Sequence, residues 1–442
     1  MAIARSEGTR RLLVITYHFP PDGSIGGQRW AGLTKYLERR GWDVDVVTAA
    51  EAGTTAVESG LTRHVRPRRK TLNDAYKAAV TRAHSAPQAV EDATASAESA
   101  PRRPSWPVRA LSAARRLGAS SLYLPDHARG WVTRAAGAAR SLLREKKFDV
   151  VITSGPPHST HFAGLLATSG FDTQFWIDMR DPWSMTHEMH LPLDRVVRTE
   201  RLFLRQLEKM VLRRADKVVA NTREFAAALK QTEPGIDVIH FPNGIDLEQA
   251  PPRDVSAVRG GSVVYAGTLY ANRNLSAVFA AMRAVLNERP EAAKVLRLDV
   301  AGPLESPHRE RMHDEITSAG LDALVHVHGV LKRKDALELV GRSHLALVLA
   351  QEQPLCVPAK IYESLGAGVP TLVLAEKDSA AANEARRIGA LTLESGDVDG
   401  LRSVLEDLLD DRIPLSAEPK APISYEELAV EMDRLLRESI GG

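Results

Sequence analysis

Apolar residues occur along the chain in two kinds of stretch, and the two kinds alternate. Short runs rich in Leu, Val and Ile, such as 11–17 and 345–350, are typical of strands that are buried on both faces. Between these runs, apolar residues recur every three or four positions, which is the period of an amphipathic helix. Strands that alternate with helices favour a parallel sheet covered by helices on both sides. The pattern therefore predicts an α/β protein.

The alternation of strands and helices occurs twice, on either side of the turn-forming sequence Pro242-Asn-Gly-Ile-Asp246. We predict an N-terminal domain over 1–245, a C-terminal domain over 246–422, and a last helix in 423–442 that packs back on the N-terminal domain. The strands are expected at 11–17, 44–48, 148–153, 174–178, 217–220 and 238–241 in the first half, and at 262–266, 295–301, 325–328, 345–350, 371–375 and 390–393 in the second.

Residues 51–107 depart from this pattern because they are rich in Ala, Ser, Thr, Arg and Pro and contain few large apolar residues. Such a composition predicts a flexible insertion. The basic run 102–116 also contains Trp106, so it is compatible with an anionic membrane surface. A solvated, arginine-rich surface is the alternative.

The composition restricts the class of protein. A chain of 442 residues with 44% apolar residues is long enough to bury two cores, and a net charge of +2 gives no general attraction to nucleic acid. One cysteine excludes an internal disulfide framework and fits a reducing compartment. The charged N-terminus lacks a secretory signal, and no stretch reaches the roughly 20 apolar residues of a spanning helix. We expect a cytoplasmic location, with attachment to the inner face of the cell membrane left open.

The stretch with the most chemical information is 357–370, Val-Pro-Ala-Lys-Ile-Tyr-Glu-Ser-Leu-Gly-Ala-Gly-Val-Pro, which lies between two apolar strands. Pro358 suits the first turn of a short helix, and glycines end it. Lys360 and Glu363 share one face of this helix. That face lies at the carboxyl end of the preceding strand, where open α/β sheets bind ligands. A simple ion pair between the two side chains is the alternative.

Two further strand exits carry glycines. The loop 18–27 lacks G-x-G-x-x-G, so the dinucleotide fingerprint of nicotinamide dehydrogenases is not met. Its Gly26 and Gly27 either let the backbone approach a phosphate at the next helix or only form the turn. The loop 265–274, Tyr-Ala-Gly-Thr-Leu-Tyr-Ala-Asn-Arg-Asn, follows the first strand of the second half.

Together, three motifs resemble the glycosyltransferases of the GT-B fold, and most closely family 4, the retaining transferases that use an NDP-sugar. These are Tyr17-His-Phe-Pro-Pro21 with the downstream Gly-Gly, Pro242-Asn-Gly-Ile-Asp246, and Pro358-Ala-Lys-Ile-Tyr-Glu363 before Gly-Ala-Gly-Val-Pro. The resemblance implies two Rossmann-like domains facing across a cleft, with the NDP-sugar on the C-terminal domain and the acceptor on the N-terminal one. It implies no metal ion and no cofactor, since the NDP-sugar is a co-substrate.

The resemblance also assigns residues to the donor. Glu363 matches a glutamate that accepts hydrogen bonds from the ribose hydroxyls, and Lys360 and Arg273 match cations at the diphosphate. Both cations are expected to act in catalysis by stabilising the leaving diphosphate. The remaining expected donor contacts are Gly26, Gly27, Gly267, Thr268, Asn274 and Ile361.

On the acceptor side, Arg180 and Asp181 occupy a loop in which many family members carry a histidine beside the reacting sugar. The resemblance implies that one of them orients the acceptor or contacts the sugar, whereas a helix cap by Asp181 before Pro182 is the alternative. The expected acceptor contacts are His18, Asp126, His158 and His161.

One position departs from the family pattern. The family's first glutamate, eight residues before the second, falls on Leu355, and Glu352 is out of register. Recognition of the donor sugar is then expected to rest on the backbone amide of Cys356 or Val357.

The sequence thus leads to the hypothesis of a retaining hexosyl transfer from an NDP-sugar to an acceptor hydroxyl in cell-envelope or exopolysaccharide glycan assembly. The acceptor is either a lipid-linked glycan or a soluble one. A natural-product glycosyltransferase is the nearest alternative. A GT-B sugar-nucleotide epimerase and a non-catalytic sugar-nucleotide binder are the other two.

Overall fold

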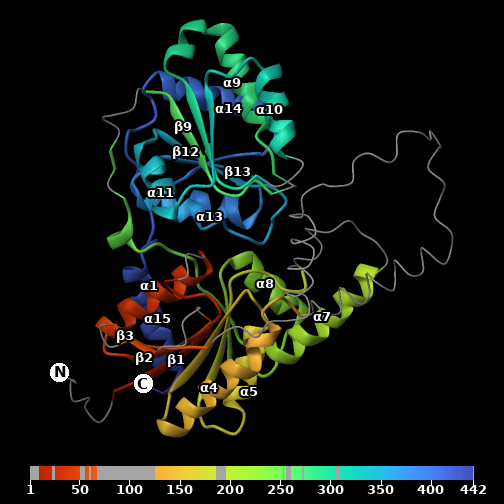
Figure 1. The fold of residues 1–442 in the computed structure, drawn as a ribbon, viewed down its shortest axis with the longest axis vertical. Coiled ribbons are helices and arrows are strands. Elements are labelled where there is room, and N and C mark those ends of the chain that lie inside the picture. The colour runs from red at the N-terminus through yellow and green to blue at the C-terminus, as the bar shows by residue number, and fades with distance from the viewer. Residues whose placement is uncertain are drawn as a thin grey trace, which may run out of the picture.

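The computed structural model of the chain describes residues 9–21, 25–49, 55–58, 61–66, 125–185, 196–251, 253–254, 260–270, 273–304 and 308–441, with only the backbone described at 25, 55–58, 196–200 and 308–310. Its two α/β domains lie one above the other in Figure 1, each built on its own sheet. The predicted fold class, two Rossmann-like domains facing across a cleft, is confirmed.

The N-terminal sheet has eight strands, all parallel to their neighbours except the antiparallel pair at one edge. From that edge the order is β3 (Thr55–Glu58), β4 (Leu61–Val65), β2 (Asp43–Thr48), β1 (Arg11–Thr16), β5 (Val150–Gly155), β6 (Gln174–Met179), β7 (Lys217–Ala220) and β8 (Val238–His240). In the described residues, the helices of this domain are α1 (Gln28–Arg39), α4 (Val132–Glu145), α5 (Thr160–Thr168), α7 (Val196–Leu212) and α8 (Arg223–Thr232), with 3-10 turns η1 (Ile25–Gly27) and η2 (Arg129–Trp131).

Alternate residues of β1 face opposite sides of the sheet, as the period of a strand requires. Leu12 and Val14 pack in the core with α1, whereas Leu13 and Ile15 pack in the core with α4. A strand that is buried on both faces needs an unbroken apolar sequence, which β1 has.

The C-terminal sheet has six strands, all parallel. Their order is β11 (Val325–Gly329), β10 (Arg297–Ala301), β9 (Ser262–Ala266), β12 (Leu345–Ala350), β13 (Thr371–Ala375) and β14 (Leu391–Leu393). The helices are α9 (Ser276–Glu288), α10 (His308–Ser318), α11 (Arg333–Arg342), α12 (Lys360–Gly366), α13 (Ala380–Ile388) and α14 (Val398–Leu409), with the 3-10 turn η4 (Pro290–Lys294).

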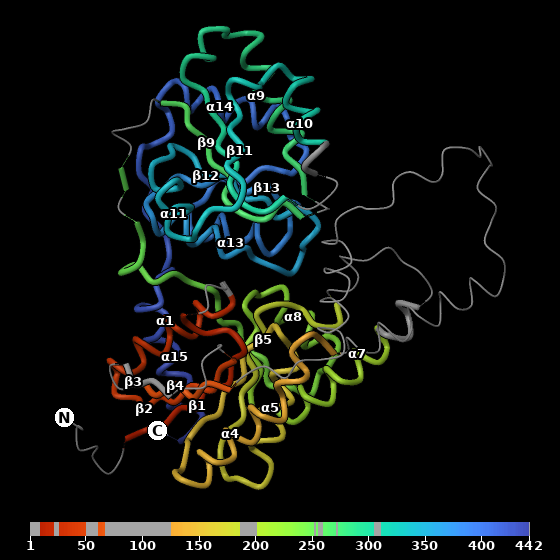
Figure 2. Tube along the Cα trace, viewed as in Figure 1, coloured from red at the N-terminus to blue at the C-terminus, as the bar shows by residue number. Residues whose placement is uncertain are grey.

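The chain crosses between the domains twice. Residues 241–246, followed by the 3-10 turn η3 (Leu247–Gln249), lead into the C-terminal domain, and residues 423–425 lead back. The two crossings lie side by side: Ile245 bridges to Ser424, and its N–H donates to the carbonyl of Ile423 at 2.8 Å. The last helix, α15 (Tyr425–Ser439), then packs beside α1 in the N-terminal domain, as the red and blue tubes of Figure 2 show.

The prediction of a flexible insertion at 51–107 needs a correction at its start. Strands β3 and β4 lie in this segment and extend the sheet, because β4 pairs in parallel with β2. His64 of β4 lies 3.0 Å from Asp45 of β2, so polar contacts take the place of apolar ones at this edge. The first four residues of β4 are only partly buried, so this strand needs few large apolar residues and its composition resembled that of a flexible segment. Residues 67–107 lie outside the described part of the chain.

No helix in the described ranges is both long and apolar enough to cross a bilayer. The basic run 102–116, for which we expected either a membrane surface or solvent, lies outside those ranges.

Candidate functional site

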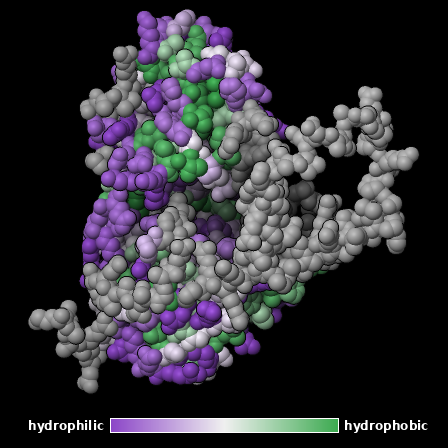
Figure 3. Space-filling model, in the orientation of Figure 1, coloured by the Kyte–Doolittle hydropathy of each residue, from purple (hydrophilic) through white to green (hydrophobic). Residues whose placement is uncertain are grey.

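A cavity of about 1380 Å³ lies between the two domains. It opens at the carboxyl ends of the strands, because its walls come from the loops that follow β5 and β6 on one side and β9 and β12 on the other. Figure 3 shows the molecule hollowed between its two domains, with hydrophilic and hydrophobic residues in the visible wall. Sites for one small molecule usually have ~300–1,000 Å³. This cavity is therefore large enough for two substrates.

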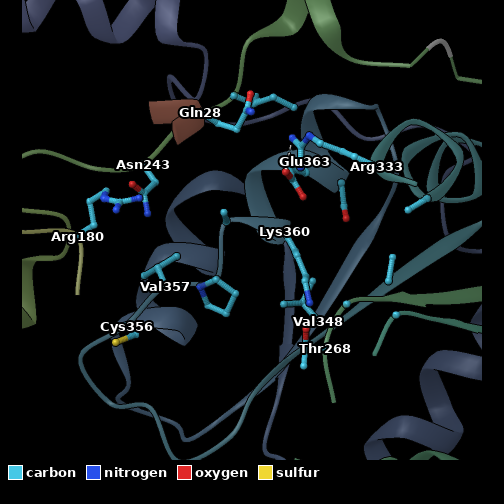
Figure 4. Close-up of a pocket in the computed structure, with 18 of the residues that line it drawn as sticks. Gln28, Arg180, Asn243, Thr268, Arg333, Val348, Cys356, Val357, Lys360 and Glu363 are labelled. Carbon is cyan, nitrogen blue, oxygen red and sulfur yellow. Dashed lines mark ion pairs between the residues drawn. The ribbon is translucent and has the colours of Figure 1, made fainter. Parts of the chain in front are cut away.

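Lys360 reaches into the cavity from the start of α12. Its Nζ lies 5.3 Å from the centre of the Tyr265 ring, and in Figure 4 the side chain extends toward Thr268 and Val348. A Cβ at residue 267 would lie 1.3 Å from the Nζ of Lys360, so a larger residue there would force the lysine side chain to move. Burial, with a contribution from the nearby Arg273, lowers the pKa of Lys360 to about 8. The lysine is thus a cation held in a restricted space beside Gly267.

Glu363 also lines the cavity, but it turns away from Lys360. Its Oε1 forms an ion pair with the guanidinium of Arg333 on α11 at 2.7 Å, drawn as the dashed line in Figure 4. The predicted alternative of a Lys360–Glu363 ion pair is therefore wrong. The two side chains share a face of the helix, as their spacing requires, but they extend toward different parts of the wall.

Arg273 is buried in the wall of the cavity, with 6% of its surface exposed. One terminal nitrogen donates to Oε1 of Gln353 at 2.7 Å, and the guanidinium lies 5.0 Å from the centre of the Tyr270 ring. Its Nε is buried and has no hydrogen-bond partner among the described residues. Arg273, Lys360 and Glu363 therefore line one cavity, together with Gly267 and Thr268.

Other predicted donor contacts do not line the cavity. Ile361 is fully buried in the core of the C-terminal domain, because it lies on the face of α12 that points away from the cavity. The backbone N–H of Asn274 donates to Oε1 of Gln351, outside the cavity lining.

The predicted glycine pair is also absent from the lining. Gly26 and Gly27 precede the lining residue Gln28, and a Cβ on Gly27 would approach the backbone of Phe19 to 3.0 Å. The glycine pair thus forms a tight turn behind the wall.

Arg180 is buried and ties three loops together. Its guanidinium donates to the carbonyl oxygens of Gly155 at 3.1 Å, Gly26 at 2.6 Å and Pro156. Arg180 also lines the cavity, so it faces the cleft as predicted while it holds these loops together. Its contact with a substrate stays a prediction. Asp181, the next residue, lines the N-terminal wall of the cavity.

Of the two predicted histidines in the 154–161 loop, only His158 lines the cavity. Its ring stacks on Trp183 with centroids 5.1 Å apart, and burial holds its pKa well below the usual range. His161 is fully buried: its Nδ1 lies 2.9 Å from the hydroxyl of Thr153, and burial lowers its pKa to about 3. The expected acceptor contact of His161 is therefore wrong, because the helix α5 turns its ring into the core.

His18 and Asp126 are also outside the lining. The carboxylate of Asp126 accepts from the N–H and the hydroxyl of Ser159, at 2.7 and 2.6 Å, and from the N–H of Ala128 at 2.9 Å. Through these hydrogen bonds, Asp126 connects the turn in which it lies to the 154–161 loop. Pro125, next to it, is the residue that reaches the cavity.

A buried ion pair at the junction of the domains was not predicted from the sequence. Arg29 lies 3.1 Å from Asp178, and both side chains are almost fully buried. The same guanidinium donates to the carbonyl of Phe241 at 3.0 Å and to Oδ1 of Asn243 at 3.0 Å, so it holds the first crossing. The only signal in the sequence was an aspartate at the end of an otherwise apolar strand.

Leu355, where the family has its first glutamate, packs against the core of the N-terminal domain. Its carbonyl accepts a hydrogen bond from the hydroxyl of Thr222 at 2.9 Å, across the two domains. Cys356 and Val357 line the cavity, and the N–H of Cys356 donates to the carbonyl of Gln353 at 3.3 Å. This loop therefore connects the domains as well as forming part of the wall.

The two halves of the chain match two family models. Residues 26–244 match the glycosyl transferase 4-like domain, and residues 256–425 match the glycosyl transferases group 1. A search of curated protein sequences gave no match.

Among solved structures, the chain is similar to sucrose-phosphate synthase from Thermosynechococcus elongatus, with a TM-score of 0.63, 14% identity, and coverage of 97% of this chain and 99% of that one. It is also similar to a glycosyltransferase from Rickettsia africae ESF-5, with a TM-score of 0.59, 11% identity, and coverage of 99% and 100%. A third is the trehalose-6-phosphate structure from E. coli bound with UDP-2-fluoro glucose, with a TM-score of 0.56, 14% identity, and coverage of 97% and 95%.

Identities this low show a common fold, whereas the family models give the class of activity. The models cover the two domains in turn, and the large cavity lies between those domains. The chain is therefore a glycosyltransferase with the GT-B fold.

Proposed function

We propose that this glycosyltransferase belongs to family 4 and transfers a hexosyl group from an NDP-sugar to an acceptor hydroxyl, with retention of the anomeric configuration. The observation that carries the proposal is the position of Arg273, Lys360 and Glu363 on one interdomain cavity of about 1380 Å³. Two cations and a carboxylate match the two polar parts of a nucleoside diphosphate, the diphosphate and the ribose diol.

In this proposal the donor lies on the C-terminal wall. Glu363 accepts hydrogen bonds from the ribose hydroxyls, since a carboxylate offers only acceptors. Lys360 and Arg273 line the cavity and are proposed to contact the diphosphate. Positive charge from these side chains takes the place that a metal ion has in other transferases, with the NDP-sugar as co-substrate and no cofactor.

The proposed reaction is a front-face displacement. The bond between the anomeric carbon and the phosphate oxygen breaks, and the bond to the acceptor oxygen forms on the same face. The acceptor proton passes to the leaving phosphate oxygen, so no protein nucleophile takes part. Arg273 and Lys360 stabilise the charge on the leaving diphosphate, and the interdomain position of the site excludes water that would hydrolyse the donor.

The acceptor is proposed to lie on the N-terminal wall, where His158, Trp183 and Asp181 meet Pro125 and Pro182. Burial keeps the His158 ring neutral at physiological pH, and its stack on Trp183 gives a firm surface for a sugar ring. We place the reaction in cell-envelope or exopolysaccharide assembly, with a lipid-linked glycan acceptor at the inner face of the membrane. A soluble natural-product acceptor is the alternative.

The test begins with thermal shifts in UDP-, GDP-, dTDP- and ADP-sugars, because a bound donor raises the melting temperature. Transfer is then assayed with the donor that binds, against lipid-linked and soluble acceptors. We expect Glu363→Ala to raise the donor KM about ten- to a hundredfold, from the loss of charge-assisted hydrogen bonds. Arg273→Ala should lower kcat about 10²- to 10³-fold.

Glu338→Ala is the control, because Glu338 is a carboxylate of the same domain that pairs with Lys334 outside the cavity. Wild-type rates in both the Glu363 and Arg273 variants would show that the donor site is wrongly placed. An epimer formed from the NDP-sugar alone, without any acceptor, would instead support a sugar-nucleotide epimerase.

A further inference from the structure

The ion pair between Arg333 and Glu363 joins two helices at the wall of the cavity. Both residues line the cavity, and a terminal nitrogen of Arg333 lies 2.7 Å from Oε1 of Glu363. The Glu363 side chain is 14% exposed and that of Arg333 is 37% exposed. Among the described residues, Oε2 of Glu363 accepts no hydrogen bond, and the carboxylate lines the cavity. One carboxylate oxygen is thus held and the other is available to a ligand.

The position of Arg333 is unfavourable for its own helix. It is the first residue of α11, after Lys332 and before Lys334, and the first turn carries only Asp335 as an acidic residue. Cations at a helix N-terminus oppose the helix dipole. Arg333 is therefore not placed there to stabilise α11, and the partner that offsets its charge is a carboxylate on another helix.

The nearer cation by sequence does not take this carboxylate. Lys360, three residues before Glu363, packs against Gly267 at another part of the wall. Arg333 therefore sets the direction of the Glu363 side chain. A planar guanidinium suits this task, because its fixed fork of donors orients a carboxylate more strictly than an ammonium does.

We propose that Arg333 is a positioning residue for ribose recognition: by holding Oε1 of Glu363, it keeps Oε2 directed at the hydroxyls of the donor ribose. This inference rests on the proposed function, in which Glu363 accepts from those hydroxyls. It adds a residue outside the motif 357–370 to donor recognition and predicts a specific signature. Loss of Arg333 should weaken binding only of nucleotides that carry the ribose diol.

The experiment measures Kd by titration calorimetry for three pairs of probes: UDP and 2′,3′-dideoxyUDP, GDP and 2′,3′-dideoxyGDP, and ADP and 2′,3′-dideoxyADP. For the base that binds, we expect Arg333→Ala to raise the Kd of the ribonucleotide about three- to fivefold, the size of a partly exposed ion pair. The Kd of the dideoxynucleotide should stay unchanged. Arg333→Lys, which keeps a cation within reach of Glu363, should recover part of the preference for the diol.

Lys334→Ala is the matched control, because it removes the neighbouring cation, which is 86% exposed and outside the cavity. Equal weakening of both nucleotides, tighter binding of the ribonucleotide, or an unchanged preference in Arg333→Ala would each overturn the inference. If Glu363→Gln loses the preference for the diol while Arg333→Ala keeps it, the inference fails and the proposed function stands. If the wild-type protein binds none of the diphosphates, the proposed function itself fails.

Discussion

The side chain of Lys360 is partly buried in the wall of the cavity, and in its present position it leaves no room for a Cβ at residue 267. Burial penalises its charged form, so its pKa falls from an ordinary value of 10.5 to about 8. A cation kept at such a cost is typical of a binding site, where an anionic ligand later compensates for the lost solvent.

We predict that Lys360→Met raises the free energy of unfolding at pH 7. The ammonium group of Lys360 has a pKa of about 8 in the folded protein and near 10.5 in the unfolded protein. Between pH 8 and pH 10.5, the unfolded state therefore binds more protons than the folded state. The wild-type protein therefore gains stability relative to the variant as the pH rises from 8 to 10.5, and the difference is constant below 8. Urea unfolding of both proteins at pH 7, 8, 9 and 10 measures this difference in the free energy of unfolding.

The same variant should lose affinity for the nucleoside diphosphate that the wild-type protein binds. A wild-type stability equal to that of Lys360→Met at every pH would contradict the assigned burial of the charge.

At the scale of elements, the contact between α1 and α15 joins the C-terminal end of the chain to the N-terminal domain. Tyr425, at the start of α15, packs so closely on Gly32 of α1 that a Cβ there would lie 2.1 Å from its ring. Ser424 caps the helix with the reciprocal hydrogen bonds of a capping box with Glu427. The glycine thus sets the distance between the two helices.

We predict that Gly32→Ala lowers the free energy of unfolding by ~1–3 kcal/mol, because the added methyl group displaces Tyr425. Gly137→Ala is the matched control: Gly137 is exposed on α4, and a Cβ there meets no atom within 4 Å. This control should gain about 0.5–1 kcal/mol, since alanine favours a helix over glycine. Denaturant unfolding of the two variants gives both values, and a loss in both would contradict the packing argument.

At the scale of the whole molecule, two separate cores are joined by two crossings that lie side by side. Arg29 holds the first crossing by its contacts with Asp178 and with the backbone of Phe241. The loop of Leu355 reaches across the cleft to Thr222, while Gln353 of the same loop accepts from Arg273. The contact between domains and the arginine proposed to bind the diphosphate thus share one short loop.

We predict that the protein loses stability in mild acid because several histidines are buried in neutral form. Burial lowers the pKa of His161 to about 3 and holds that of His158 well below its usual range, whereas both bind a proton near 6.5 when unfolded. The free energy of unfolding is therefore highest above pH 6.5 and falls as the pH decreases below that value, by about 2 kcal/mol at pH 5 for His161 and in the same direction for His158.

Urea unfolding between pH 7.5 and 5 tests this, and His161→Gln should reduce the slope of stability against pH by up to one proton. His313→Gln, at an exposed position of α10, is the control. An unchanged slope in His161→Gln would contradict the buried neutral ring.

The sequence by itself determined the elements, the two-domain fold and the main candidates for the donor site. Strand and helix periods are local, so β1, β12 and α12 were readable from short windows of sequence. Residues at the carboxyl ends of parallel strands meet at one edge of the sheet whatever the details of packing. Lys360 and Glu363 could therefore be selected before their distances were known, and the resemblance to the glycosyltransferase motifs added Gly267 and Arg273.

Only the tertiary structure decided which charges meet and which polar residues leave the site. Arg333 and Glu363 are far apart in the chain and pair because α11 and α12 pack side by side. Arg180 lines the cavity while its guanidinium binds carbonyl groups of two neighbouring loops, whereas close packing turns the ring of His161 into the core. The direction of a side chain depends on neighbours from several elements at once, and no local period of the sequence contains that information.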